Sequence, residues 1–218
     1  MAQCDRWIDG IKEHPYWDTR IFQKHEIFPE YLKNSFYNNI CVKLYKRKLV
    51  ENVPFPLGRP IMEDASWTSH VFEKCNAVAR IADAKYNYRM VPSSQTHTKL
   101  SERKECGKFR NQIEKATVIE RHVDDKDSLD NLYSMVMEFT PWILGSYDDL
   151  NMFDTYDALR ILISRLCERG YHCELFGFIQ QNPDFRKAQD AYLLYGLKKK
   201  DYDLKYKMKI IYRRIKKR

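Results

Sequence analysis

Two adjacent carboxylates, Glu63 and Asp64, are the residues of this sequence with the clearest chemical potential. They follow a loop, residues 54–60, whose prolines restrict their own backbone and that of the residues before them. Adjacent side chains diverge by about 100° on a helix or 180° on a strand, so we do not expect both to act on one atom. The pair therefore disfavours a glycoside hydrolase, which needs two carboxyl groups facing each other across ~5–9.5 Å, unless a distant carboxylate joins one of them.

The elements around this pair are expected to be a strand before it and a helix after it. Residues 37–50 alternate in part, with Ile40, Val42 and Leu44 on one face and Cys41, Lys43 and Tyr45 on the other. From Asp64 onward the apolar residues recur at about one helical turn: Trp67, Val71, Phe72 and Cys75. Asp64 suits the N-cap of this helix, where its carboxylate would accept free amide N–H groups.

The rest of the chain divides into a short mixed part and a helical part. Residues 1–36 are expected to be helical, from the spacing of Trp7, Ile8 and Ile11. Two short strands are predicted at 77–83 and 85–90. Helices are predicted over residues 109–123, 129–144, 155–170 and 183–197, with Gly170 as a stop and the pairs Asp124-Asp125 and Asp148-Asp149 as helix starts.

This order of features resembles the family 2 glycosyltransferases of the GT-A fold, especially the bacterial enzymes that build surface polysaccharides. The match covers roughly residues 37–98. It rests on a basic strand, a Phe-Pro-x-Gly loop, the acidic pair, and a Tyr-x-Tyr-Arg strand followed by serines. The counterparts here are Lys43-Leu44-Tyr45-Lys46-Arg47, Phe55-Pro56-Leu57-Gly58-Arg59, Glu63-Asp64, and Tyr86-Asn87-Tyr88-Arg89 with Ser93-Ser94.

The resemblance implies an inverting transfer of a sugar from a nucleotide-sugar to a saccharide or lipid-linked acceptor. Asp64 would be the base that takes the acceptor proton, and Glu63 would position the acceptor or the loop. Contacts to the donor diphosphate would come from Arg89, Ser93, Ser94 and Thr96. Acceptor contacts would come from Lys43 and Arg59, and His97 would be a late metal ligand.

Each of these residues also has a structural interpretation. Asp64 could be only a helix cap, and Arg89 could form a surface ion pair. Ser93 and Ser94 could be turn residues, His97 a solvated loop histidine, and Lys43 and Arg59 part of a solvated face.

The resemblance covers only the acceptor side of such an enzyme. A GT-A domain begins with a nucleotide-binding half that ends in an Asp-x-Asp motif holding a divalent metal, Mg or Mn. Nothing before Tyr37 supplies that half, and Asp201-Tyr202-Asp203 lies in a basic tail. The expected fold is therefore α/β, a partial GT-A domain with a helical C-terminal extension. The chain would be truncated, work with a separate donor-binding polypeptide, or be an inactive relative.

The positive charge is confined to the C-terminal end. The net charge is +8, but residues 198–218 hold eleven Lys/Arg against two Asp, which leaves about −1 for the other 197 residues. Leu204, Met208, Ile211 and Ile215 form one helical stripe there, suited to an anionic membrane or to packing on the protein body. A nucleic-acid-binding protein is the alternative, but no recognised binding motif accompanies the tail. A non-catalytic interaction protein derived from a glycosyltransferase is another.

Composition gives the remaining expectations. The six cysteines show no CxxC or zinc-ligand spacing, which is typical of reduced thiols in a cytoplasmic protein. We expect no transmembrane span, and a location in the cytoplasm or at the inner face of the membrane. The predicted parts are an acceptor-side domain at 1–99, a helical region at 100–197 and the basic tail at 198–218.

Overall fold

The computed structural model describes residues 3–8, 11–13, 18–33, 36, 38–82, 85–87, 102–145 and 153–198. The chain forms two compact units, Met1–Ser134 and Met135–Arg218, which divide within a helix. Among the described residues, no helix is long and apolar enough to cross a membrane.

The first unit begins with strands. β1 (Gln3–Ile8) pairs antiparallel with β2 (Ile11–Glu13) and parallel with β5 (Lys85–Asn87). A second sheet pairs β3 (Arg20–Gln23) antiparallel with β4 (Ala77–Arg80). The strand predicted at 77–83 is confirmed over residues 77–80, but residues 81 and 82 are not part of it. The strand predicted at 85–90 is confirmed over its described residues, 85–87.

The prediction of helix over residues 1–36 is wrong for most of the described residues of that segment. Among those residues only α1 (Lys24–Leu32) is helical, while Trp7, Ile8 and Ile11 lie on paired strands. Ile8 is the register partner of Ile11 in this ladder, so two residues that matched a helical spacing lie at paired positions of neighbouring strands.

The predicted strand at residues 37–50 is also wrong. Its described part contains a 3₁₀ turn, η1 (Ile40–Val42), an extended stretch and a one-turn helix, α2 (Arg47–Val50). The alternation fails because Val42 is buried, whereas Leu44 is 99% exposed. The strand interpretation required both side chains on one face.

The remaining helices follow the sequence closely. α3 (Glu63–Glu73), α4 (Glu102–Glu120), α5 (Lys126–Leu144), α6 (Phe153–Glu168) and α8 (Phe185–Lys198) confirm the predicted helices, and α7 (Glu174–Gln181) was not predicted. Gly170 has φ +90° just after α6, as expected of a helix stop. Asp125 accepts the Ser128 N–H at 2.9 Å and so begins α5.

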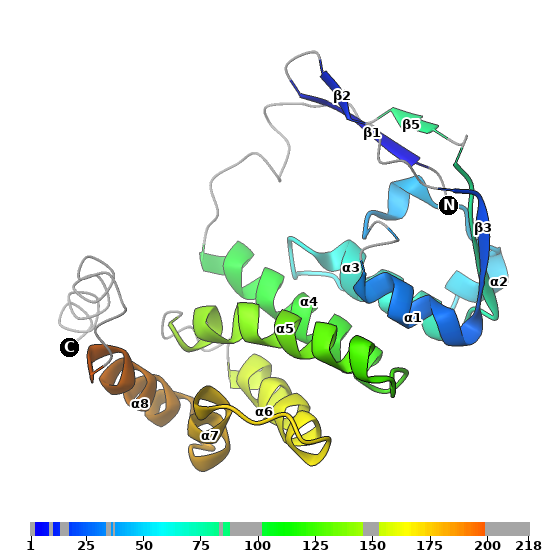
Figure 1. Ribbon diagram of the computed structural model, residues 1–218. Coiled ribbons are helices and arrows are strands. Elements are labelled where there is room, and N and C mark those ends of the chain that lie inside the picture. The colour runs from blue at the N-terminus through cyan, green and yellow to red at the C-terminus, as the bar shows by residue number, and fades with distance from the viewer. Residues whose placement is uncertain are drawn as a thin grey trace. The chain divides into compact units, whose positions relative to one another are not determined.

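Apolar packing holds each unit separately. In the first, α3 lies beside α4 (Figure 1), and an aromatic chain runs from Phe22 through Phe36 to Phe72 and Tyr31. In the second, α7 packs against α6 and α8, and Phe185 contacts both Phe153 and Tyr156. The first unit contains all the described residues of the predicted site.

Most of the described residues are helical, and the two sheets are small. The assignment to the GT-A fold stays a prediction.

Candidate active site around Asp64

Asp64 lies inside the first turn of α3 and is not its N-cap. The N-cap is Met62, whose carbonyl accepts the N–H groups of Ala65 and Ser66 at 3.0 and 3.2 Å. The N-cap therefore lies two residues earlier than predicted. The Asp64 carboxylate is left to accept the backbone N–H of Ile40, from the preceding segment, at 3.3 Å.

The approach to α3 has an unusual backbone. Ile61 and Met62 both have positive φ, +74° and +64°, a region that non-glycine residues seldom adopt. Asn111 of α4 holds this bend, since its side-chain amide donates to the carbonyls of Arg59 at 3.0 Å and of Ile61 at 2.9 Å. Asn111 is fully buried. One polar side chain thus positions the turn that presents the acidic pair.

Among the predicted site residues, Lys43 interacts electrostatically with Asp64. Burial lowers the pKa of Lys43 to about 7, and the negative charge of Asp64 opposes that shift. The Lys43 ammonium donates to the carbonyl of Asn39. Lys43 is partly buried, and its amine has a partner within the protein.

Three residues that were not predicted extend this site. Asn38 Oδ1 accepts from Tyr31 Oη at 2.8 Å and from Lys115 Nζ at 3.2 Å. Lys115 Nζ also lies 4.1 Å from the centre of the Tyr31 ring, a cation–π distance. Burial lowers the pKa of Lys115 to about 8 and raises the pKa of Tyr31. We refer to Tyr31, Asn38, Lys43, Asp64 and Lys115 as the Asp64 cluster.

Within the Asp64 cluster, the pKa of the carboxylic acid and the pKa values of the two amines lie closer together than their ordinary values. Burial raises the pKa of Asp64, against the smaller opposing effects of the Ile40 N–H and Lys43. The two lysines shift in the opposite direction. Perturbed groups of opposite type gathered in one place are typical of sites that exchange protons. Asp64 Oδ2 holds Ile40, and Oδ1 has no hydrogen bond within the described part of the chain, so it can accept a proton from a ligand.

Glu63 and Arg59 are not brought into this cluster. Glu63 begins α3 and makes no hydrogen bond or ion pair with the other described residues. Arg59 Nη1 lies 2.5 Å from Glu114 Oε2 of α4, so its guanidinium is engaged within the protein. The predicted acceptor contact of Arg59 would require this ion pair to open.

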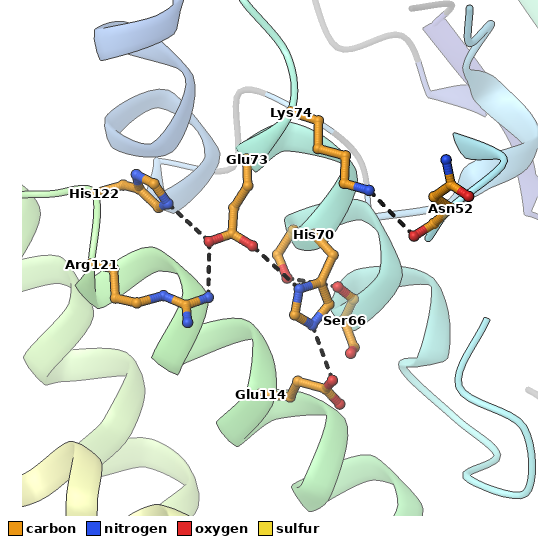
Figure 2. A network of polar contacts seen from close by, with 9 residues as sticks. Asn52, Ser66, His70, Glu73, Lys74, Glu114, Arg121 and His122 are labelled. Atoms are coloured by element: carbon orange, nitrogen blue, oxygen red, sulfur yellow. Dashed lines mark hydrogen bonds and ion pairs between the residues drawn. The ribbon is translucent and has the colours of Figure 1, made fainter. Parts of the chain in front are cut away.

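Through Glu114, Arg59 instead contacts a second polar group, the His70 clasp. The clasp consists of His70, Glu73, Glu114, Arg121 and His122 (Figure 2). His70 Nε2 lies 3.0 Å from Glu114 Oε1, and His70 Nδ1 lies 3.3 Å from Glu73 Oε2. Glu73 Oε1 also contacts Arg121 at 2.8 Å and His122 at 3.0 Å. Glu114 raises the pKa of His70, while His70, Arg121 and His122 help to lower the pKa values of the two glutamates. The clasp joins α3 to α4.

The other predicted site residues lie outside the described residues: Arg89, Ser93, Ser94, Thr96 and His97. In the described ranges, no group of three or more His, Cys, Asp or Glu could hold a metal ion. The expected Mg or Mn stays a prediction. The chemistry proposed below uses side chains alone.

Comparisons of the chain with protein-family models, with curated proteins and with solved structures find no match.

Proposed function

We propose that this chain takes part in glycosyl transfer from a nucleotide-sugar to a saccharide or lipid-linked acceptor, as the acceptor-side part of a GT-A-like enzyme. The observation that carries the proposal is the Asp64 carboxylate, partly buried at the start of α3 with one oxygen uncommitted and its pKa raised by burial. A general base works best when its pKa moves toward the working pH.

In the proposed step, an acceptor hydroxyl donates its proton to Asp64 Oδ1 as the hydroxyl oxygen attacks the anomeric carbon. The bond from that carbon to the diphosphate oxygen breaks, and the nucleotide diphosphate leaves with the bonding electrons. Lys43 acts here as a positioning residue, because its charge favours the ionised form of Asp64. The protonated form of the Lys43 amine, which is well populated near pH 7, would supply this effect.

The donor contacts assigned to Arg89, Ser93, Ser94 and Thr96 remain part of the proposal, as does the metal role of His97. They rest on the resemblance of the sequence to family 2 glycosyltransferases. The proposed partners are the nucleotide-sugar and its acceptor, in the cytoplasm or at the inner face of the membrane.

The test uses the full chain with a panel of UDP-sugars, Mn²⁺ and simple saccharide acceptors. Calorimetry measures donor binding, and release of UDP measures transfer. We expect Asp64→Asn to reduce the transfer rate by about 10²–10⁴-fold, the usual contribution of a general base, with donor affinity unchanged. Glu63→Gln is the matched control and should keep most of the activity. Absence of donor binding, or an Asp64→Asn rate equal to that of the unchanged protein, would contradict the proposal.

A further inference from the structure

An almost fully exposed leucine, Leu44, lies in the extended segment before α2. Lys43 and Lys46 both have extended backbone angles, φ −130°, ψ 146° and φ −66°, ψ 125°. Side chains alternate along such a segment. Tyr45 packs against Trp67, with ring centroids 5.2 Å apart, so Leu44 projects the other way and is 99% exposed.

A second leucine projects from the loop that leads to α3. Leu57 is 86% exposed, beside Gly58, whose φ of +78° makes the turn. Phe55, two residues earlier, lies with its ring centroid 6.2 Å from that of Trp67 and is 39% exposed. The indole N–H of Trp67 donates to the Val53 carbonyl at 2.9 Å. Trp67 therefore anchors both leucine-bearing segments.

Three cations accompany Leu44. Lys46, Arg47 and Lys48 are exposed, and the structure gives none of them an ion pair within its described ranges. The acid next to them in the chain is Glu51, also exposed. The segment is therefore strongly positive around an apolar side chain that is almost fully exposed.

We propose that Leu44, Leu57, Lys46, Arg47 and Lys48 form a surface that binds an anionic lipid bilayer. Aliphatic side chains enter the boundary between headgroups and acyl chains, while lysines and arginines pair with anionic headgroups. A nucleic acid would use the cations but would gain nothing from two projecting leucines, which favours the bilayer. This surface is independent of the proposed glycosyl transfer, since it uses neither Asp64 nor a donor.

The experiment measures sedimentation of the full chain with vesicles of phosphatidylcholine, with and without phosphatidylserine. We expect binding only with phosphatidylserine. Hydrogen exchange should slow in residues 43–58 when the vesicles bind. Each cation near an anionic surface contributes about fivefold, so the triple variant Lys46→Gln/Arg47→Gln/Lys48→Gln should bind roughly a hundredfold more weakly. Leu44→Ser/Leu57→Ser should lose about tenfold or more.

Controls separate this surface from the rest of the chain. Ile161→Ser replaces another exposed aliphatic residue, 55% exposed on α6, and should leave binding unchanged. Ile211→Ser/Ile215→Ser tests the basic tail and should leave the exchange protection of residues 43–58 in place. The proposal would be overturned if the chain bound neutral vesicles equally well, or if the leucine variant bound vesicles fully. It would also be overturned if the chain bound duplex DNA instead of vesicles and the leucine variant kept that DNA binding. The activity assay with UDP-sugars is read separately.

Discussion

His70 Nε2 of α3 lies 3.0 Å from Glu114 Oε1 of α4, a contact between residues 44 positions apart in the sequence. Glu73 contacts the other ring nitrogen, so the imidazole bridges two carboxylates. Protonated His70 can donate to both, whereas neutral His70 can donate to only one. The strength of the join between α3 and α4 therefore depends on pH.

The first prediction concerns the pH dependence of stability. The folded-state pKa of His70 is raised, so the contribution of His70 to the free energy of unfolding is complete below its ordinary pKa of 6.5. That contribution is lost as pH rises through the raised pKa. The pKa values of Glu73 and Glu114 are lowered, so the contribution of the two glutamates is present above their ordinary pKa of 4.5 and is lost as pH falls. Denaturant titration should show His70→Gln costing about 1–2 kcal/mol between these values and less at alkaline pH. His172→Gln, at an exposed position outside the clasp, is the control; an equal loss of stability in both variants would contradict the assignment.

A second prediction concerns the close approach of α4 to the Pro-rich loop. A Cβ added at Gly107 would lie 2.4 Å from the Pro60 carbonyl oxygen, a backbone atom that cannot move aside cheaply. Gly107→Ala should therefore destabilise the protein by about 1–3 kcal/mol, despite the better helix propensity of alanine. Gly177→Ala in α7 meets nothing within 4 Å and should stabilise by about 0.5–1 kcal/mol. Thermal unfolding of both variants checks the opposite signs.

A third prediction concerns the bend at Ile61 and Met62. Asn111→Ala removes the donor shared by two partly buried carbonyls and should cost about 1–3 kcal/mol, the penalty of leaving such groups unpaired. Exchange of the amides near residue 61 should quicken as the turn loosens. Asn131→Ala, on an exposed position of α5, should change stability by no more than a few tenths of a kcal/mol. If Asn111→Ala left the stability unchanged, the bend would not depend on this side chain.

A fourth prediction concerns the amine of Lys43. Competitive acetylation followed by mass spectrometry should give a reactivity midpoint at pH about 7, because burial disfavours the charged form. Asp64 raises this pKa, so Asp64→Asn should move the midpoint to lower pH. Lys24, which is exposed, is the internal reference. A Lys43 midpoint near the ordinary 10.5 would show that the amine is solvated.

The secondary structure was predictable where long apolar stripes repeat. α4, α5, α6 and α8 were located because a helix of many turns shows its period clearly. The described residues before α1 were mistaken for helix because three apolar residues match more than one period. Asp9-Gly10 between Ile8 and Ile11 is the hairpin signal that would have corrected this prediction.

The site was predictable only in its centre. Asp64 stood out because an acidic residue follows a stiff loop and begins an apolar helix. Asn38, Lys115 and Tyr31 gave no such signal, since a lysine or asparagine near a helical stripe is ordinarily solvated. Lys115 is 5% exposed here because α4 packs its face onto α3 and α1 residues.

The sequence alone determined the apolar periods, the position of the acidic pair and the confinement of excess positive charge to the C-terminal end. Tertiary structure decided that Asp64 holds Ile40 rather than capping α3, that Arg59 pairs with Glu114, and that Lys43 turns inward while Leu44 turns outward. The physical reason is that local periods depend on neighbours within a turn or two. Burial and ion pairing depend on segments that meet only when the chain folds.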